Sequence, residues 1–168
     1  MIKIINNFFD KDVLDRVQKH VTTNLYYTPS WFEGQEKTKE NYYGDRFFLN
    51  DDLELKKMFI KQAENKFKIK IIDINSASGI DLRNLDHFKP HTDDGLAKIN
   101  ILIMLYGPIA VSNGTVFYSN ELDIHVGFRP NRAVLFPSNW MHSQHASKDK
   151  GIRRYTSTLF VKDYQDVL

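Results

Sequence analysis

After residue 67, short apolar segments recur at close intervals, and turn-forming residues separate them. Short strands at this spacing predict a mainly β fold, an antiparallel double-sheet barrel of the jelly-roll kind. Segment 99–105 is apolar at every position except Asn100, which indicates a strand that is covered on both faces. The candidate strands are 68–75, 80–88, 97–106, 115–118, 122–127, 131–136 and 153–162. The turn signals are Ser78-Gly79, Asp94-Gly95, Gly107-Pro108, Asn113-Gly114 and Arg129-Pro130-Asn131.

Two helices are expected before this strand-rich part, after a short strand at 2–5. The first helix follows Asp10 as N-cap, because the apolar residues after it fall on one helical face. The second helix spans about 51–66, with Asp51 as its cap. We expect both helices to pack on the outside of one sheet. Residues 24–45 combine tyrosines, breakers and charges, which predicts a long irregular segment that could form a lid or a binding loop.

The bulk properties favour one soluble domain, 1–168, with a helical support and an aromatic loop in 1–67 and a barrel core in 68–162. The net charge is only +2 and charges of both signs are interspersed, so there is no strong nucleic-acid signal. No apolar run approaches the roughly 20 residues that cross a bilayer, and the first residues lack a signal-peptide core. We therefore expect a cytoplasmic protein. The chain has no cysteine, which excludes thiolate chemistry and disulfides. The oligomeric state is left open.

His91 and Asp93 form a His-x-Asp motif on an extended segment that ends at a predicted turn. Residues two apart on extended backbone point to the same side, so this imidazole and this carboxylate can bind one metal ion. The third ligand must come from elsewhere, and His142, after the apolar segment 133–136, is the candidate. Two histidines and one carboxylate form the facial triad of non-haem Fe(II) oxygenases. The same donors also suit Mn(II), Co(II) or Ni(II).

The other histidines provide alternatives, and a His-x-Asp motif on its own is usually a surface turn. His87 and His145 are the competitors for the metal, and His145 could instead support a ligand or face the substrate. We interpret His20 as a solvated helix residue and His125 as a structural strand residue. The motif therefore needs support from the rest of the chain.

In their order along the chain, the motifs resemble those of the Fe(II)/2-oxoglutarate-dependent oxygenase superfamily, in particular its small prolyl-4-hydroxylase-like members from bacteria and their viruses. The resemblance covers roughly residues 68–162. His91-Thr92-Asp93 stands at the family's His-x-Asp, and segment 131–142 is similar to the strand that leads to the distal histidine. Segment 151–156 is similar to the family's Arg-x-Ser/Thr segment. Asn113-Gly114-Thr115 stands where many members have a Gly-Gly turn, so one glycine is missing.

The resemblance implies a double-stranded β-helix and an enzyme that uses Fe(II), 2-oxoglutarate and O2 to hydroxylate an unactivated C–H bond, releasing succinate and CO2. It implies that His91, Asp93 and His142 hold iron. It also implies that Arg154, helped by the hydroxyl of Thr156 or of a nearby tyrosine, holds the far carboxylate of 2-oxoglutarate. Ascorbate is a further candidate cofactor.

The choice of arginine follows from strand alternation, which allows only one of Arg153 and Arg154 to face the barrel interior. Arg154 gives the Arg-x-Thr pattern, and Arg153 is the alternative. A guanidinium suits the role because it stays charged and can bind a carboxylate bidentately. Two rival hypotheses are a cupin-type metal enzyme that does not use 2-oxoglutarate, for which Arg154 would be expendable, and a non-catalytic binding module on the same barrel.

The substrate is less well specified than the cofactors. By analogy with the similar subfamily, a peptidyl proline or another amino-acid side chain is the first choice, with free amino acids and small metabolites next. Aromatic residues near the predicted cleft could stack on a prolyl ring. The candidate substrate-binding residues are Tyr42, Tyr43, Arg46, Trp140 and His145.

Overall fold

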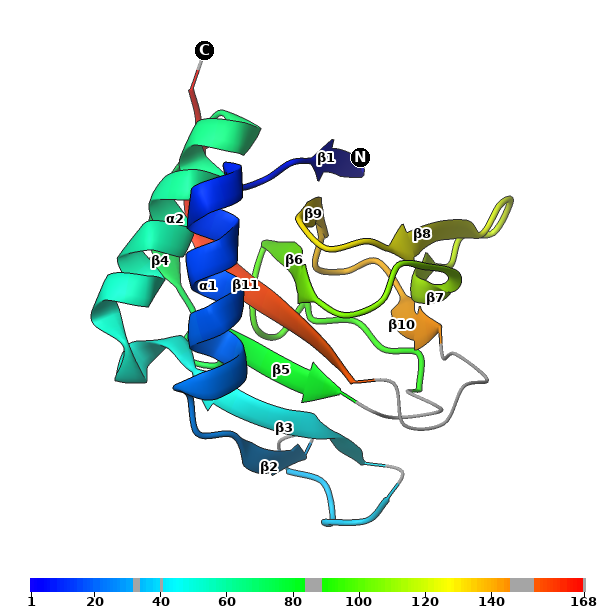
Figure 1. Cartoon of the computed structure of the whole chain (residues 1–168). Coiled ribbons are helices and arrows are strands. Elements are labelled where there is room, and N and C mark those ends of the chain that lie inside the picture. Colours follow the sequence, from blue (N-terminus) through cyan, green and yellow to red (C-terminus); the bar gives the residue numbers. More distant parts are fainter. Residues whose placement is uncertain (32–33, 40, 84–88, 146–152, 168) are drawn as a thin grey trace.

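Two antiparallel sheets of unequal size make up most of the molecule, and two helices cover the larger one (Figure 1). The structure is a computed structural model and describes residues 1–31, 34–39, 41–83, 89–145 and 153–167, without the side chains of Tyr43, Ala110, Val111 and His145. The large sheet has the order β1 (Lys3–Asn6), β9 (Arg132–Pro137), β6 (Ile99–Tyr106), β11 (Arg154–Asp166), β5 (Gly79–Arg83), β3 (Tyr42–Phe48), β2 (Thr28–Trp31), and β4 (Ile69–Ile74) pairs with the end of β11. The small sheet has the order β10 (His142–His145), β7 (Ala110–Phe117), β8 (Ile124–Phe128). This mainly β architecture with antiparallel sheets is a double-stranded β-helix, as predicted.

The helices α1 (Lys11–Thr23) and α2 (Leu53–Phe67) lie against the outer face of the large sheet, as predicted (Figure 1). In α2, Leu55, Phe59, Ala63 and Phe67 are buried at a spacing of one turn, and they form the face that packs on the sheet. The predicted cap of this helix was one residue too early. Asp52 caps α2 by accepting a hydrogen bond from the Leu55 amide, while Asp51 ends a short 3-10 helix (Leu49–Asp51).

The central strand β6 is covered on both faces, as its apolar sequence predicted. Its odd-numbered residues, such as Ile101 and Ile103, belong to the apolar cluster under the helices. On the other face, Met104 belongs to a second apolar cluster that lies between the two sheets, together with Phe117, Phe136 and neighbouring residues. The helices therefore stabilise one side of the large sheet, and the other side lines the interior between the sheets.

Three local predictions were wrong. Residues 24–45 are not wholly irregular, because β2 and the start of β3 lie there as the edge of the large sheet, where Pro29 needs no amide partner. Asn113-Gly114 is not a turn but lies inside β7, where a Cβ at Gly114 would collide with the Val126 carbonyl oxygen. The segment that carries His142 forms a strand of its own, β10, after the turn that follows β9.

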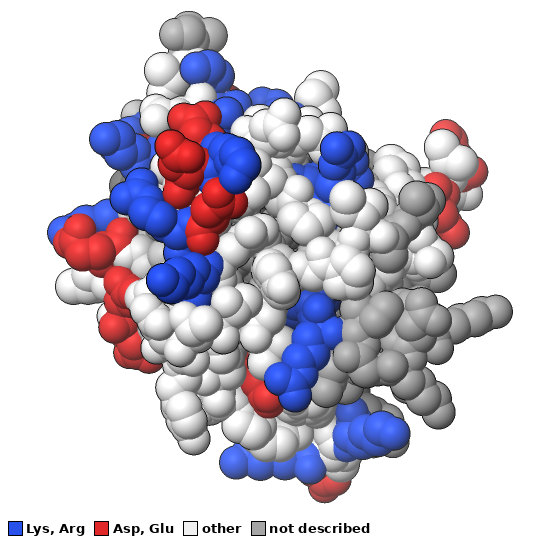
Figure 2. Space-filling model, viewed as in Figure 1, with Lys and Arg blue, Asp and Glu red and all other residues white. Residues whose placement is uncertain are grey.

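Charged side chains of both signs are mixed on the face that carries the helices (Figure 2). Some form local pairs, such as Lys11 with Asp15 in α1 and Lys57 with Glu54 in α2. This face shows no stripe of basic residues alone, in agreement with the balanced charge of the sequence. Of the helices in the described part of the chain, none has the length and apolar character that crossing a membrane requires.

Candidate metal centre and cavity

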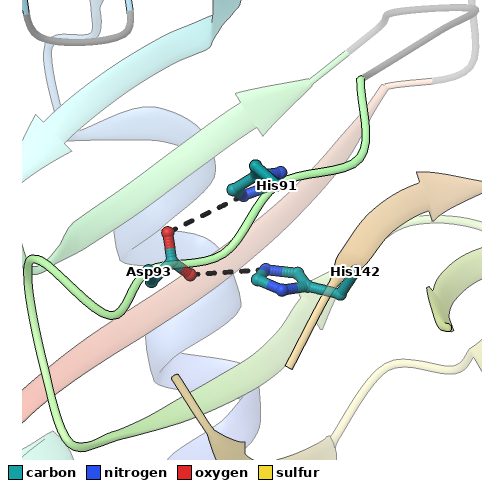
Figure 3. Close-up of side chains that lie close together, drawn as sticks. All are labelled: His91, Asp93 and His142. Atoms are coloured by element: carbon teal, nitrogen blue, oxygen red, sulfur yellow. Dashed lines mark ion pairs between the residues drawn. The ribbon is translucent and has the colours of Figure 1, made fainter. Parts of the chain in front are cut away.

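Three potential metal ligands meet where the segment after β5 crosses the start of β10 (Figure 3). One donor atom from each of His91, Asp93 and His142 lies within 4.8 Å of the other two. The Nε2 atoms of His91 and His142 lie 3.7 Å and 3.3 Å from the two carboxylate oxygens of Asp93. A pair of backbone hydrogen bonds between His91 and His142, each 2.9 Å long, joins the two segments and fixes this approach.

Both imidazoles are oriented by backbone carbonyl groups. His91 Nδ1 lies 3.0 Å from the Lys89 oxygen, and His142 Nδ1 lies 2.9 Å from the Trp140 oxygen. A carbonyl oxygen only accepts, so each Nδ1 carries the proton and donates it. In the neutral rings, each Nε2 therefore presents its lone pair toward Asp93. This arrangement is typical of metal-ligating histidines, whose second nitrogen is held by a hydrogen bond.

Asp93 is nearly buried, and its orientation is also fixed. Its amide donates to the Ser138 carbonyl, and Asn100 Nδ2 donates to its Oδ2 at 2.6 Å. Burial opposes ionisation of Asp93, but its interactions with His142, with smaller effects of His91 and Asn100, outweigh it and lower the pKa of the carboxyl. Asp93 is therefore a carboxylate at neutral pH.

Burial, followed by the neighbouring His142, lowers the pKa of His91 to about 4. The imidazole is thus neutral at pH 7, the state that a metal ligand requires. Two lone pairs and a carboxylate converge on one point, and donors about 2.1 Å from one ion at right angles would lie about 3 Å apart. The residues present therefore fit a divalent cation with nitrogen and oxygen ligands, such as Fe(II).

The metal centre opens into a cavity of about 370 Å3 between the two sheets. All three candidate ligands line it. The large sheet contributes Arg83 from β5, Met104 from β6 and Arg154 from β11, among others. The small sheet contributes Thr115 from β7 and Gln144 from β10. The cavity therefore joins the candidate metal ligands to polar side chains of both sheets.

Arg154, Thr156, Thr158 and Phe160 alternate along β11 and all line this cavity. Arg153 precedes the strand and is exposed. The Arg154 Nη1 donates to Asn113 Oδ1, and its guanidinium carbon lies 5.5 Å from the centre of the Phe128 ring. Its Nε is buried without a hydrogen-bond partner in the described structure. Burial, followed by the nearby Arg83, lowers the pKa of Arg154 to about 9, so the residue is a buried cation at neutral pH.

Of the residues predicted to bind substrate, some line the cavity and others do not. Arg46 is buried, lines the cavity and donates from Nε and Nη2 to the two oxygens of Asp81 at 2.6 Å and 2.8 Å. Of the described side chains, Tyr42 and Trp140 do not line the cavity. The Tyr42 hydroxyl donates to Asp45, and Trp140 packs against the apolar cluster between the sheets. The side chains of Tyr43 and His145 are not among those described, and His87 and residues 146–152 lie outside the described residues.

Sequence reasoning missed several polar residues of the cavity region. Asn100, which holds Asp93, interrupts an apolar run on the face opposite to the helices, and this signal was available. Asp81 and Arg83 alternate with apolar residues in β5, which also predicts a shared polar face. Trp31 was not missed: it lies in the aromatic segment that was expected to contribute to the cleft, and it lines the cavity.

No protein-family model matches the sequence, and no curated protein matches it. Solved structures do match. A prolyl hydroxylase from Trichoplax adhaerens, in complex with a hypoxia inducible factor peptide fragment, has a TM-score of 0.70 at 15% identity over 96% of this chain and 83% of its own. The epimerase SnoN, in complex with Fe3+, alpha ketoglutarate and nogalamycin RO, has a TM-score of 0.68 at 10% identity over 98% and 78%. A Pseudomonas putida prolyl-4-hydroxylase has a TM-score of 0.57 at 11% identity over 96% and 92%. The chain thus has the fold of the Fe(II)/2-oxoglutarate-dependent oxygenases, including prolyl-4-hydroxylase-like members.

Proposed function

We propose that this protein is an Fe(II)- and 2-oxoglutarate-dependent oxygenase that hydroxylates an unactivated C–H bond. The observation that carries the proposal is the position of three metal-ligand donors and a buried arginine along one cavity of this fold. Bound Fe(II), together with 2-oxoglutarate and O2, would supply the oxidising chemistry, with release of succinate and CO2. The protein supplies the binding and the orientation of the reactants, and a shielded site.

In this proposal His91, Asp93 and His142 hold the metal. The carbonyl groups of Lys89 and Trp140 keep the two Nε2 lone pairs directed at it. A facial set of three ligands would leave the other coordination positions to reactants in the cavity that all three residues line. No general base is required of the chain, since oxidation would occur at the metal.

Arg154 is proposed to bind the far carboxylate of 2-oxoglutarate, with the Thr156 hydroxyl beside it on the same face of β11. The described contacts of Arg154 are a neutral amide and an aromatic ring, and the carboxylate of Asp81 acts on its charge without forming an ion pair with it. An anionic ligand would form such an ion pair, and a planar guanidinium can bind it bidentately.

For the substrate, we propose an amino-acid side chain, with peptidyl proline as the first choice. Trp31 and Phe48 line the cavity and offer aromatic surface for a prolyl ring. Two of the similar structures are prolyl hydroxylases, one of them with a bound peptide fragment. This part of the proposal rests on similarity of fold, which hosts other substrates as well.

The proposal is tested by adding Fe(II) and 2-oxoglutarate under anaerobic conditions and recording the visible charge-transfer band. Succinate release in air is measured on the same samples with proline peptides and free amino acids. Asp93→Ala should remove the band and reduce succinate release by about 100-fold or more, since a ligand is lost. Asp94→Ala, one residue away and exposed, is the matched control and should behave like the wild type.

A wild-type protein that shows neither the band nor succinate would overturn the proposal. Iron binding without any affinity for 2-oxoglutarate would favour the cupin-type alternative instead.

A further inference from the structure

Two arginines lie directly opposite each other on adjacent strands of the cavity wall. In the antiparallel pairing of β5 with β11, Arg83 is the register partner of Arg154. Both line the cavity, and both are largely buried, since the Arg83 side chain is 15% exposed and the residue Arg154 is 4% exposed. Like charges directly opposite one another on a sheet are destabilising. The charge of Arg83 also contributes, after burial, to the lowered pKa of Arg154.

Side chains around the pair hold the two guanidiniums in place. Neutral amides accept from each, Gln144 from Arg83 and Asn113 from Arg154. Asp81 contacts Arg83 at 3.1 Å, but both of its oxygens are already bound by Arg46 at 2.6 Å and 2.8 Å. Arg83 and Arg46 thus both contact the carboxylate of Asp81, whereas the guanidinium of Arg154 forms no ion pair with a described residue.

We propose that Arg83 and Arg154 form a two-arginine clamp that binds a single carboxylate between strands β5 and β11, the distal carboxylate of 2-oxoglutarate. The inference rests on the proposed function and adds Arg83, which no motif indicated. An anion between two facing cations changes their repulsion into two attractions. The planar donor groups of the arginines suit a carboxylate, which can accept from both at once. Asp81 and the two amides then serve to keep the guanidiniums in place when the carboxylate is absent.

The clamp predicts that Arg83 contributes to the affinity only for ligands that carry a distal carboxylate. Binding is measured anaerobically by calorimetry on Mn(II)-loaded protein, so no turnover is needed. The ligands are 2-oxoglutarate and 2-oxopentanoate, which has the same 2-oxo acid group but no distal carboxylate. Arg83→Gln should weaken 2-oxoglutarate binding by about tenfold to a hundredfold, the range for a lost hydrogen bond to a charged group, and leave 2-oxopentanoate binding unchanged.

Two further variants complete the test. Arg83→Lys keeps the charge but loses the planar fork, so it should give an intermediate loss. Arg129→Gln removes a charge from an exposed turn outside the cavity and should bind both ligands as the wild type does. The Kd of Mn(II) and the thermal unfolding of each variant establish that the metal site and the fold are intact.

Equal 2-oxoglutarate affinity in Arg83→Gln and wild type would overturn the clamp, as would an equal loss for both ligands. If the Arg83 variants do not fold, a structure of wild type with Mn(II) and 2-oxoglutarate decides. The clamp requires an Arg83 nitrogen within about 3 Å of the distal carboxylate, and contact with Arg154 alone contradicts it. Failure of the wild type to bind 2-oxoglutarate would instead overturn the proposed function, so the two failures are distinguishable.

Discussion

The two faces of the large sheet have opposite characters although they share one backbone. On the face under the helices, Leu159 and Val161 of β11 join Ile101 and Ile103 of β6 in an apolar cluster. On the opposite face, the alternate residues of the same strands include Arg154 and polar groups that are just as deeply buried. These residues are Asn100, Arg154, Thr156 and Thr158. The difference therefore lies in chemistry and not in burial.

The contrast separates what stabilises the fold from what the fold is used for. Each buried apolar side chain under the helices contributes about 1.5–3 kcal/mol to stability. Buried polar groups on the cavity face cost free energy unless they are hydrogen-bonded, and a buried cation such as Arg154 costs more. We infer that burial of apolar side chains on the helix face offsets the free-energy cost of the buried polar and charged groups on the cavity face. Such local departures from good packing are expected at functional sites.

The largest effect is expected on the helix face, from Phe59→Ala. Phe59 is fully buried and its ring contacts Phe9 at a centroid distance of 5.5 Å. The substitution leaves a cavity and should lower the free energy of unfolding by about 3–5 kcal/mol in urea denaturation. Leu53→Ala, at an exposed position of the same helix, should change it by less than about 0.5 kcal/mol. Equal effects of the two would show that the helix face is not the main source of stability.

Much of the fold could be predicted from the sequence, because periodicity reports directly on burial. Both helices, the β-rich character of the chain after residue 67 and the two-sided burial of β6 were predicted and are confirmed. What failed was the edge of the sheet. In β2, Pro29 and polar neighbours look like a loop, because an edge strand needs few amide bonds and little apolar surface. Asn113-Gly114 looked like a turn because the close approach of Val126, which requires glycine, is not visible in sequence.

For the candidate site, the sequence indicated the metal-ligand and arginine residues but not the hydrogen-bond partners that orient them. The structure brings His91, Asp93 and His142 together and directs Arg154 into the same cavity, while the roles of these residues stay predictions. Partners such as Asn113, which accepts from Arg154, could not be assigned, because hydrogen bonds between strands distant in sequence depend on register. Register is set by the packing of the whole sheet.

A smaller loss of stability is expected at low pH, because of the buried imidazole of His91 at the cavity. Burial lowers the pKa of His91 to about 4, whereas in the unfolded chain it lies near 6.5. As the pH falls from about 6.5 toward 4, the unfolded state takes up a proton that the folded state does not. The metal-free protein should therefore lose stability, on the order of 3 kcal/mol from this group. Urea denaturation at several pH values measures the loss.

The matched variant for this pH test is His91→Asn, which removes the titrating imidazole and should flatten the profile. Asp93 acts in the same direction, because its pKa is also lowered, but its contribution is lost only below its ordinary value of 3.8. The two groups are therefore separated by their pH ranges. Parallel profiles for wild type and His91→Asn between pH 6.5 and 4 would contradict the assignment.

The smallest effect is expected from Arg154→Met, and its sign is the sharpest test of the comparison between the two faces. The pKa of Arg154 is lowered to about 9 by burial and by Arg83, so at pH 7 the folded state carries the full cost of a buried cation. Methionine removes that cost but leaves Asn113 without its donor. The metal-free variant should therefore be as stable as the wild type or more stable, by up to about 2 kcal/mol in urea denaturation. The same substitution at the exposed Arg153 should have no effect. A loss of stability in Arg154→Met would mean that this arginine supports the fold. The division of the sheet into a stabilising face and a binding face would then fail at Arg154, the residue on which the binding proposal depends.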